Sequence, residues 1–143
     1  MAREEILRAV KARLESMTTA NGYGVDLGLN VHYFQDFPEV YDGPPALAFF
    51  DEEEENAEVG YQQERRLKMR VDAVAYIQSD AIAESCGLLS DVIRAIGVDR
   101  QWGGHALNTT LGTNEKHIEA MGRRACRVTQ EFEIVYRVGP FES

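Results

Sequence analysis

The stretch from Arg65 to Ile77 alternates apolar and polar residues more regularly than any other part of the chain. Alternation with a period of two predicts a β-strand with one dry face and one mostly polar face, because successive side chains of a strand point to opposite sides. The dry face is expected to hold Leu67, Met69, Val71, Ala73, Ala75 and Ile77. The other face is expected to hold Arg66, Lys68, Arg70, Asp72, Val74 and Tyr76. The chain should therefore build around a sheet.

Two segments have the spacing of amphipathic helices. The first runs from Glu4 to about Met17, and the second from Asp80 to Ile96. Ser79 and Asp80 offer an N-cap for the second helix, and Gly97 a stop. Its apolar stripe is predicted to be Ile82, Cys86, Leu89, Ile93 and Ile96.

Further strands are predicted on both sides of the second helix, at residues 29–34, 46–50, 107–111, 117–120 and 126–138. Helices are too few for a parallel βαβ architecture. We expect one α+β domain over residues 1–143, with a mostly antiparallel sheet, two helices on one face and a short tail at 139–143.

An acidic run separates the strand at 46–50 from the alternating strand. It contains Asp51, Glu52, Glu53, Glu54, Glu55 and Glu58 and no cation. We interpret residues 51–64 as a long, charged hairpin loop in solvent. The crowded carboxylates do not have the alternating ligands and glycine bend of a calcium loop, so no metal is expected there.

No motif points to catalysis or to a cofactor. The chain has no phosphate-binding loop, dinucleotide fingerprint or nucleophile elbow. His32, His105 and His117 are scattered, and Cys86 and Cys126 are both expected in the core. A net charge of −9 disfavours nucleic-acid binding, and no apolar run reaches the length of a membrane span or a signal peptide.

Basic residues cluster at two places and are candidates for a subunit interface. They are Arg65, Arg66, Lys68 and Arg70 on the alternating strand, and Arg123 and Arg124 in a predicted turn. A solvated sheet face is the alternative interpretation. As an interface, the basic strand of one copy would face the acidic loop of the next, a heterologous contact that can close into a ring. Reversing Arg66, Lys68 and Arg70 to Glu is then expected to abolish rings.

The order of these elements resembles that of the tail terminator (tail completion) proteins of long-tailed bacteriophages, of the lambda U-protein type. The likeness runs from Ile6 to Arg137 and is carried by the N-terminal helix, the charged hairpin returning through residues 66–76, the helix at 80–96 and the closing strand that ends in residues 132–137. It lies in the order and character of the elements, not in a diagnostic motif.

The resemblance implies a structural protein, not an enzyme: a homohexameric ring that caps the tail tube, stops its polymerisation and meets the connector or neck proteins of the head. DNA would pass through without specific binding, past an acidic loop facing the lumen or a neighbouring subunit. The protein would reside in the host cytoplasm during assembly and then in the virion, with no membrane involved. The alternatives are another phage neck or head–tail connector protein, an acidic inhibitor that mimics DNA, and a small-molecule enzyme.

Overall fold

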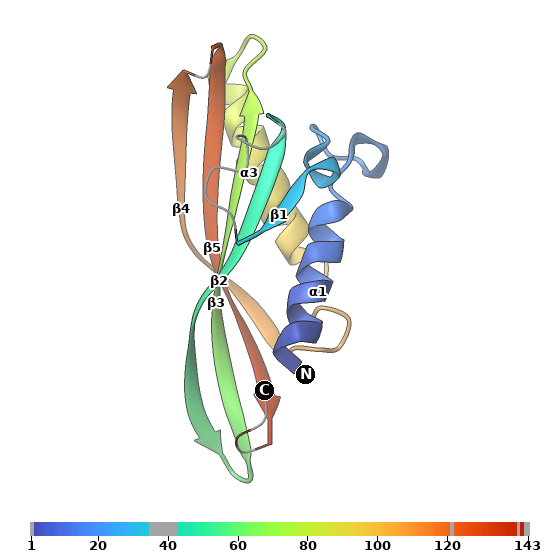
Figure 1. Ribbon diagram of the computed structural model, residues 1–143, viewed down its shortest axis with the longest axis vertical. Coiled ribbons are helices and arrows are strands. Elements are labelled where there is room, and N and C mark those ends of the chain that lie inside the picture. Colours follow the sequence, from blue (N-terminus) through green and yellow to red (C-terminus); the bar gives the residue numbers. More distant parts are fainter. Residues whose placement is uncertain (1, 35–42, 121, 140, 142–143) are drawn as a thin grey trace.

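Five strands in the order β1-β2-β3-β5-β4 form a strongly twisted sheet, and both long helices lie on one face of it (Figure 1). The computed structural model describes residues 2–34, 43–120, 122–139 and 141. The elements are α1 (Ala2–Glu15), two 3₁₀ turns (Thr19–Asn21 and Leu27–Leu29), β1 (Val31–Tyr33), β2 (Ala46–Val59), β3 (Gln62–Tyr76), α3 (Ala81–Gly97), β4 (Asn108–Ala120) and β5 (Arg124–Val138). Only β1 and β2 are parallel; the other neighbours are antiparallel. The predicted α+β class is confirmed.

The core lies between the helices and the sheet. Ile6, Val10 and Leu14 of α1 are buried there. The whole dry face predicted for the alternating strand is buried too, which confirms that assignment. Residues of β5 from Cys126 to Val138 alternate in the same way, and the inward Gln130 is satisfied because its amide donates to the carbonyl oxygens of Gly112 and Glu131.

Helix α3 begins as predicted but faces the sheet with a different stripe. The Asp80 carboxylate accepts hydrogen bonds from the backbone N–H groups of Ile82 and Ala83, so the N-cap is confirmed. The buried residues of α3 are Ser85, Leu88, Val92, Ala95 and Ile96. Ile82 is 78% exposed and the Cys86 thiol is also exposed, so the predicted stripe is wrong at these two positions. Ile96 is buried as predicted, Leu89 packs against the core while partly exposed, and Ile93 is half-buried. Apolar residues occupy a broad arc of α3. Packing buries the part of this arc that contains Leu88 and Val92, which lies next to the predicted stripe.

The acidic run is not a loop. Strand β2 continues through it to Val59, and a two-residue turn at Gly60 and Tyr61 leads directly into β3. Gly60 has φ +63°, a value that suits the first turn position of a type II′ hairpin. The physical reason for this correction lies in the pairing: acids of β2 stand opposite cations of β3, which reduces the repulsion between neighbouring carboxylates.

The two short strands predicted at 107–111 and 117–120 are parts of the single strand β4, which has a bulge between Leu111 and Asn114. Its start is anchored by the only tryptophan of the chain, Trp102. The indole N–H of Trp102 donates to the Thr109 hydroxyl at 2.7 Å, and the Arg13 guanidinium lies 3.8 Å from the ring centroid.

Parts of the predicted turn around Pro38 and of the predicted tail at 139–143 lie outside the described residues. Phe141 is described and is fully exposed. None of the described helices is long and apolar enough to cross a membrane.

Candidate functional site

The acidic and basic clusters predicted to meet across two subunits lie side by side within one hairpin. In the register of β2 and β3, Glu53 stands opposite Lys68 and Glu55 opposite Arg66. The Lys68 ammonium is 2.8 Å from a carboxylate oxygen of Glu53. This hydrogen bond is the main cause that raises the pKa of Lys68 above its usual value. One ion pair, between Glu53 and Lys68, therefore joins the two clusters within a protomer.

A β-bulge at Glu52 divides the acidic run between the two faces of the sheet. The register shifts between Asp51 and Glu53, so Asp51 and Glu54 both point toward α1, while Glu53 points to the open face. In an unbroken strand Asp51 and Glu54 would lie on opposite faces.

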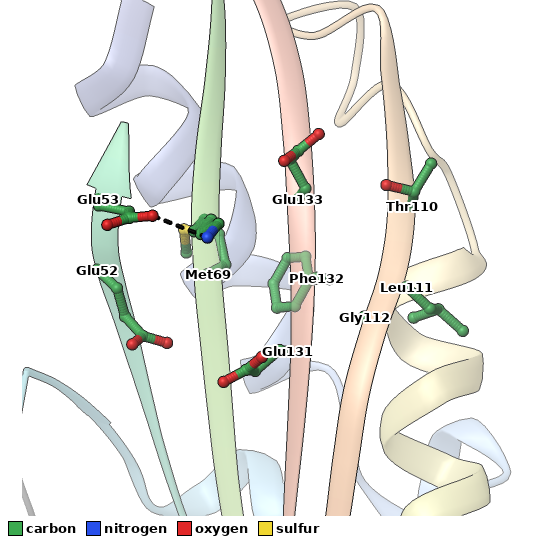
Figure 2. A pocket seen from close by; sticks show the side chains of 10 residues that line it. Glu52, Glu53, Met69, Thr110, Leu111, Gly112, Glu131, Phe132 and Glu133 are labelled. Carbon is green, nitrogen blue, oxygen red and sulfur yellow. Dashed lines mark ion pairs between the residues drawn. The ribbon is translucent and has the colours of Figure 1, made fainter. Parts of the chain in front are cut away.

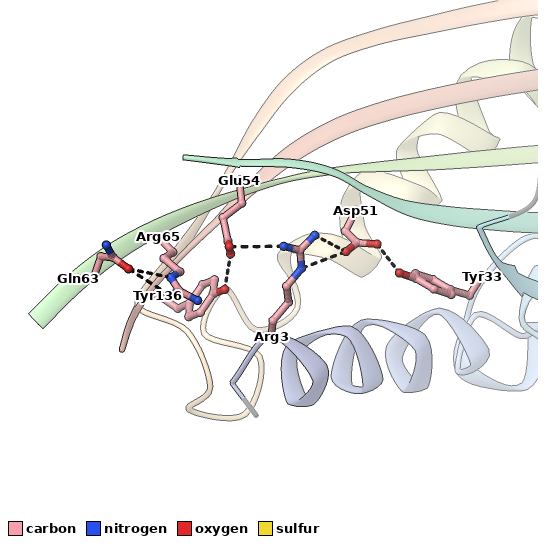
Figure 3. A network of polar contacts seen from close by, with 7 residues as sticks. All are labelled: Arg3, Tyr33, Asp51, Glu54, Gln63, Arg65 and Tyr136. Carbon is pink, nitrogen blue, oxygen red and sulfur yellow. Dashed lines mark hydrogen bonds and ion pairs between the residues drawn. The ribbon is translucent and has the colours of Figure 1, made fainter. Parts of the chain in front are cut away.

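On the helix side, Asp51 and Glu54 belong to a partly buried polar network (Figure 3). Arg3, near the start of α1, donates to Asp51 at 2.6 Å and to Glu54 at 3.4 Å. The Tyr33 hydroxyl donates to Asp51, and the Tyr136 hydroxyl donates to Glu54. Burial, and then the hydrogen bond to a carboxylate, raise the pKa of each tyrosine to about 12.

The interface candidate Arg65 also belongs to this side. Its side chain is buried and donates to the amide oxygen of Gln63 at 3.0 and 3.3 Å (Figure 3). Arg65 is therefore part of the fold and offers no exposed cation to a neighbour.

On the open face, a shallow hollow of about 530 Å³ lies over β2, β3, β5 and β4 (Figure 2). Glu52, Glu53, Glu131 and Glu133 line it, and Lys68 is the one cation among its lining residues. Arg66, beside the hollow, is 3.7 Å from Glu133 and 3.3 Å from Glu64. The face is thus a mixed-charge surface in which most cations are matched.

Arg70 is held by neighbours of its own chain. Its guanidinium lies 4.6 Å from the Phe50 ring centroid and 3.4 Å from Asp72. Its Nε is buried and, among the described residues, has no hydrogen-bond partner. At the other end of the sheet, Arg123 stacks 4.3 Å from the Tyr76 ring centroid, and Arg124 opens β5 as an exposed residue.

At each of its two edges, the sheet has a strand segment with no described strand on its outer side. Strand β1 covers β2 only from Leu47 to Phe49, so the outer edge of residues 50–59 is free of a described partner. Strand β4 has β5 on one side and no described strand on the other. Exposed backbone donors and acceptors on such edges are ready to pair with another chain.

The histidines occupy separate places. His105 is 3.4 Å from Glu5 and His117 is 3.2 Å from Glu115, while His32 lies in β1. Among the described residues, no group of three or more His, Cys, Asp and Glu side chains is arranged to hold a metal ion.

Sequence reasoning missed the partners of the acidic run that come from distant segments. Arg3, Tyr33 and Tyr136 lie far from Asp51 and Glu54 in the sequence, and the bulge that joins them has no glycine to mark it. It also missed Lys116, whose ammonium lies 3.1 Å from the Cys86 sulfur and 3.3 Å from the Ser85 hydroxyl.

Comparison with protein-family models finds no match, and comparison with curated proteins finds none either. Among solved structures, the chain is similar to the crystal structure of the type 4 fimbrial biogenesis protein PilO from Pseudomonas aeruginosa, with 14% identity and a TM-score of 0.35. The match covers 64% of this chain and 58% of that one, so this chain spans little more than half the length of PilO's. A likeness at this level carries no argument about fold or function.

Proposed function

We propose that this chain is a structural subunit that assembles into a homohexameric ring, caps the head-proximal end of a phage tail tube and stops its polymerisation. The ring would then present a surface to the head–tail connector proteins. Two observations support the proposal. The order of helices and strands is the order on which the resemblance to tail terminators rests, and the chain has the α+β fold that this order predicts.

The two strand edges that no described strand pairs with are the observation on which the proposal depends. At one edge of the sheet the outer side of β4 has no described partner strand. At the other edge the same is true of residues 50–59 of β2. Soluble proteins usually shorten or cover such edges, because an exposed edge pairs with other chains. Two different edges on opposite sides of one sheet suit a head-to-tail contact, and head-to-tail contacts form rings when the rotation closes.

The charge distribution favours this role over that of a DNA-mimicking inhibitor. Such an inhibitor needs a face of unopposed carboxylates, whereas Lys68, Arg66 and Arg70 lie among the acids of the open face. The remaining exposed acids of β2 are Glu52, Glu55 and Glu58, of which Glu55 stands opposite Arg66. In a ring they would repel the phosphates of passing DNA instead of binding them.

The test is assembly followed by a functional assay. Sedimentation velocity over a range of concentrations and negative-stain microscopy are expected to show rings with a central hole. Adding the protein to polymerising tube protein is expected to arrest tube growth. Rings without arrest would favour another neck or connector protein, and a monomer that also ignores tube ends would contradict the proposal.

A further inference from the structure

A cysteine of α3 and a lysine of β4 are in contact where the helix passes beside the strand. The Lys116 ammonium donates to the Cys86 sulfur at 3.1 Å and to the Ser85 hydroxyl at 3.3 Å. Lys116 and Cys86 lie 30 positions apart in the sequence, so the packing of β4 beside α3 brings them together. The fold thus holds a thiol and a primary amine within reach of one another.

The backbone fixes the direction in which the lysine points. Lys116 stands opposite Val128 of β5, whose side chain lies in the core, so Lys116 is on the helix side of the sheet. Ser85 is 4% exposed, and its hydroxyl donates to the carbonyl oxygen of Ile82 at 3.3 Å, which orients it as an acceptor for Lys116. The lysine is therefore anchored beside Cys86 by a second acceptor that belongs to a buried residue.

The Cys86 thiol is open to oxidants in solvent because the residue is exposed. Hydrogen peroxide oxidises an accessible thiol to a sulfenic acid, through the thiolate in equilibrium with that thiol. The sulfur of a sulfenic acid is electrophilic and condenses with a nearby nitrogen nucleophile to form an S–N bond. The Lys116 nitrogen is the nucleophile that the structure places next to this sulfur.

The second thiol of the chain, that of Cys126, lies in a different environment. The residue is 1% exposed, and burial raises the pKa of its thiol. Such a thiol reacts slowly, because the thiolate is the nucleophile and oxidants do not reach it. Peroxide is therefore expected to oxidise Cys86 and to spare Cys126.

We propose that Cys86 and Lys116 form a redox-sensitive link: hydrogen peroxide oxidises the thiol, and the Lys116 amine then attacks the oxidised sulfur, which ties β4 to α3 by a covalent S–N bond. The observation that carries the proposal is the contact between the exposed sulfur and the anchored nitrogen. This link does not depend on the proposed ring.

The chemistry balances in two steps. In the first, the Cys86 thiolate attacks one oxygen of hydrogen peroxide, the O–O bond breaks and hydroxide leaves, so that sulfur is oxidised by two electrons and peroxide is reduced. In the second, the Lys116 nitrogen, after giving one proton to solvent, attacks the sulfenic sulfur. The S–O bond breaks, the nitrogen loses a further proton and water leaves. In sum, the thiol and the amine lose two hydrogen atoms, and one peroxide becomes two waters.

The link would fasten a strand at the edge of the sheet. Strand β4 pairs with β5 on one side and with no described strand on the other. A covalent bond from Lys116 to α3 would restrict the unfolded chain as a disulfide does, and so it would stabilise the fold. Thiols would reverse the link, since a thiolate attacks the linked sulfur and releases the amine.

Mass spectrometry after peroxide treatment tests the link. In a Cys126→Ala variant, where no internal disulfide can form, the product is expected to be about 2 Da lighter than the untreated chain and to revert with dithiothreitol. Digestion should yield the Cys86 peptide joined to the Lys116 peptide. Peptide mapping of the natural chain gives the same information, because it distinguishes this link from a disulfide. The melting temperature, followed by circular dichroism, should rise on oxidation.

Lys116→Arg separates the link from oxidation of the thiol. It keeps a positive charge and hydrogen-bond donors but removes the primary amine, so the reaction should stop at a sulfenic acid about 16 Da heavier, which dimedone captures. Lys11→Arg changes an exposed lysine of α1 in the same way. It is the matched control and should form the link like the natural chain.

The outcomes decide the link without reference to assembly. If the natural chain stops at the sulfenic acid, or if Lys116→Arg still becomes lighter, the S–N bond does not form between these residues. A product about 14 Da heavier would retain an oxygen between sulfur and nitrogen and would overturn the direct bond. A Cys86 thiol that peroxide leaves unchanged while it oxidises a peptide of the same local sequence would refute the accessible thiol. None of these results bears on the ring, which sedimentation velocity measures separately.

Discussion

Asp51 and Glu54 lie three positions apart on one strand and yet share a single cation, Arg3, on the same face of the sheet (Figure 3). The bulge at Glu52 makes this possible because it reverses the alternation between them. The network ties the first turn of α1 to the middle of β2, and so it connects the helical layer to the hairpin formed by β2 and β3.

Replacing Arg3 with Ala is expected to destabilise the protein by about 2 kcal/mol, because two largely buried carboxylates lose their charged donor. Arg8→Ala is the matched control. It removes an exposed arginine from the same helix and one Glu4 pair, worth about 0.3–0.5 kcal/mol. Chemical denaturation of both variants measures the difference; equal losses would show that the network adds nothing to stability.

Deleting Glu52 is expected to be far more damaging than changing its side chain. The deletion removes the bulge and turns Glu54 away from Arg3 and Tyr136, or else it shifts the register between β2 and β3 beyond residue 52. Glu52→Gln keeps the bulge and should be nearly neutral, since this side chain is exposed. Thermal melting compares the two variants, and a deletion as stable as the substitution would contradict the role given to the bulge.

Thr109→Val is expected to cost about 1–3 kcal/mol, because it leaves the buried indole N–H of Trp102 without its acceptor. Thr110→Val, the same change one residue later on the exposed side of β4, should have little effect. Trp102 reports unfolding directly by fluorescence, since it is the only tryptophan.

The tyrosines of the network should ionise late. Because the folded-state pKa of Tyr33 and Tyr136 is raised from 10 to about 12, their stabilising contribution is complete below pH 10 and is lost as the pH rises through about 12. Titration followed by tyrosinate absorbance should show two late-ionising groups. The double variant Tyr33→Phe/Tyr136→Phe should lose the ionisation near pH 12. If that ionisation persists in the variant, other tyrosines cause it.

Glu84 should give stability a dependence on acid pH. Its carboxylate accepts hydrogen bonds from the backbone N–H groups of Gln78, Ser79 and Asp80, and these hold its pKa below the usual 4.5. The contribution is present above pH 4.5 and is lost as the pH falls through the lower folded-state pKa. Glu84→Gln should therefore be less stable than the natural chain at neutral pH, and the gap should close in acid. A gap of constant size would show that ionisation is not its cause.

Local patterns were sufficient for much of the fold. The alternation in β3 identified every buried residue of its dry face, and Asp80 marked the start of α3, because strand period and helix capping depend on neighbouring residues. The interface role of Arg66, Lys68 and Arg70 remains a prediction. Their reversal to Glu would also place like charges beside Glu53, Glu133 and Asp72 within one protomer, so the folding of the triple variant has to be measured together with its assembly.

The sequence by itself determined the elements of this protein: two amphipathic helices, an alternating central strand, and acidic and basic clusters. Only the tertiary structure decided which apolar stripe of α3 meets the sheet, that the acidic run is a strand, and that Arg3 binds both of its inward carboxylates. The reason is physical. Periodicity depends on residues a few positions apart, whereas burial, register and ion pairing depend on partners that only folding brings together.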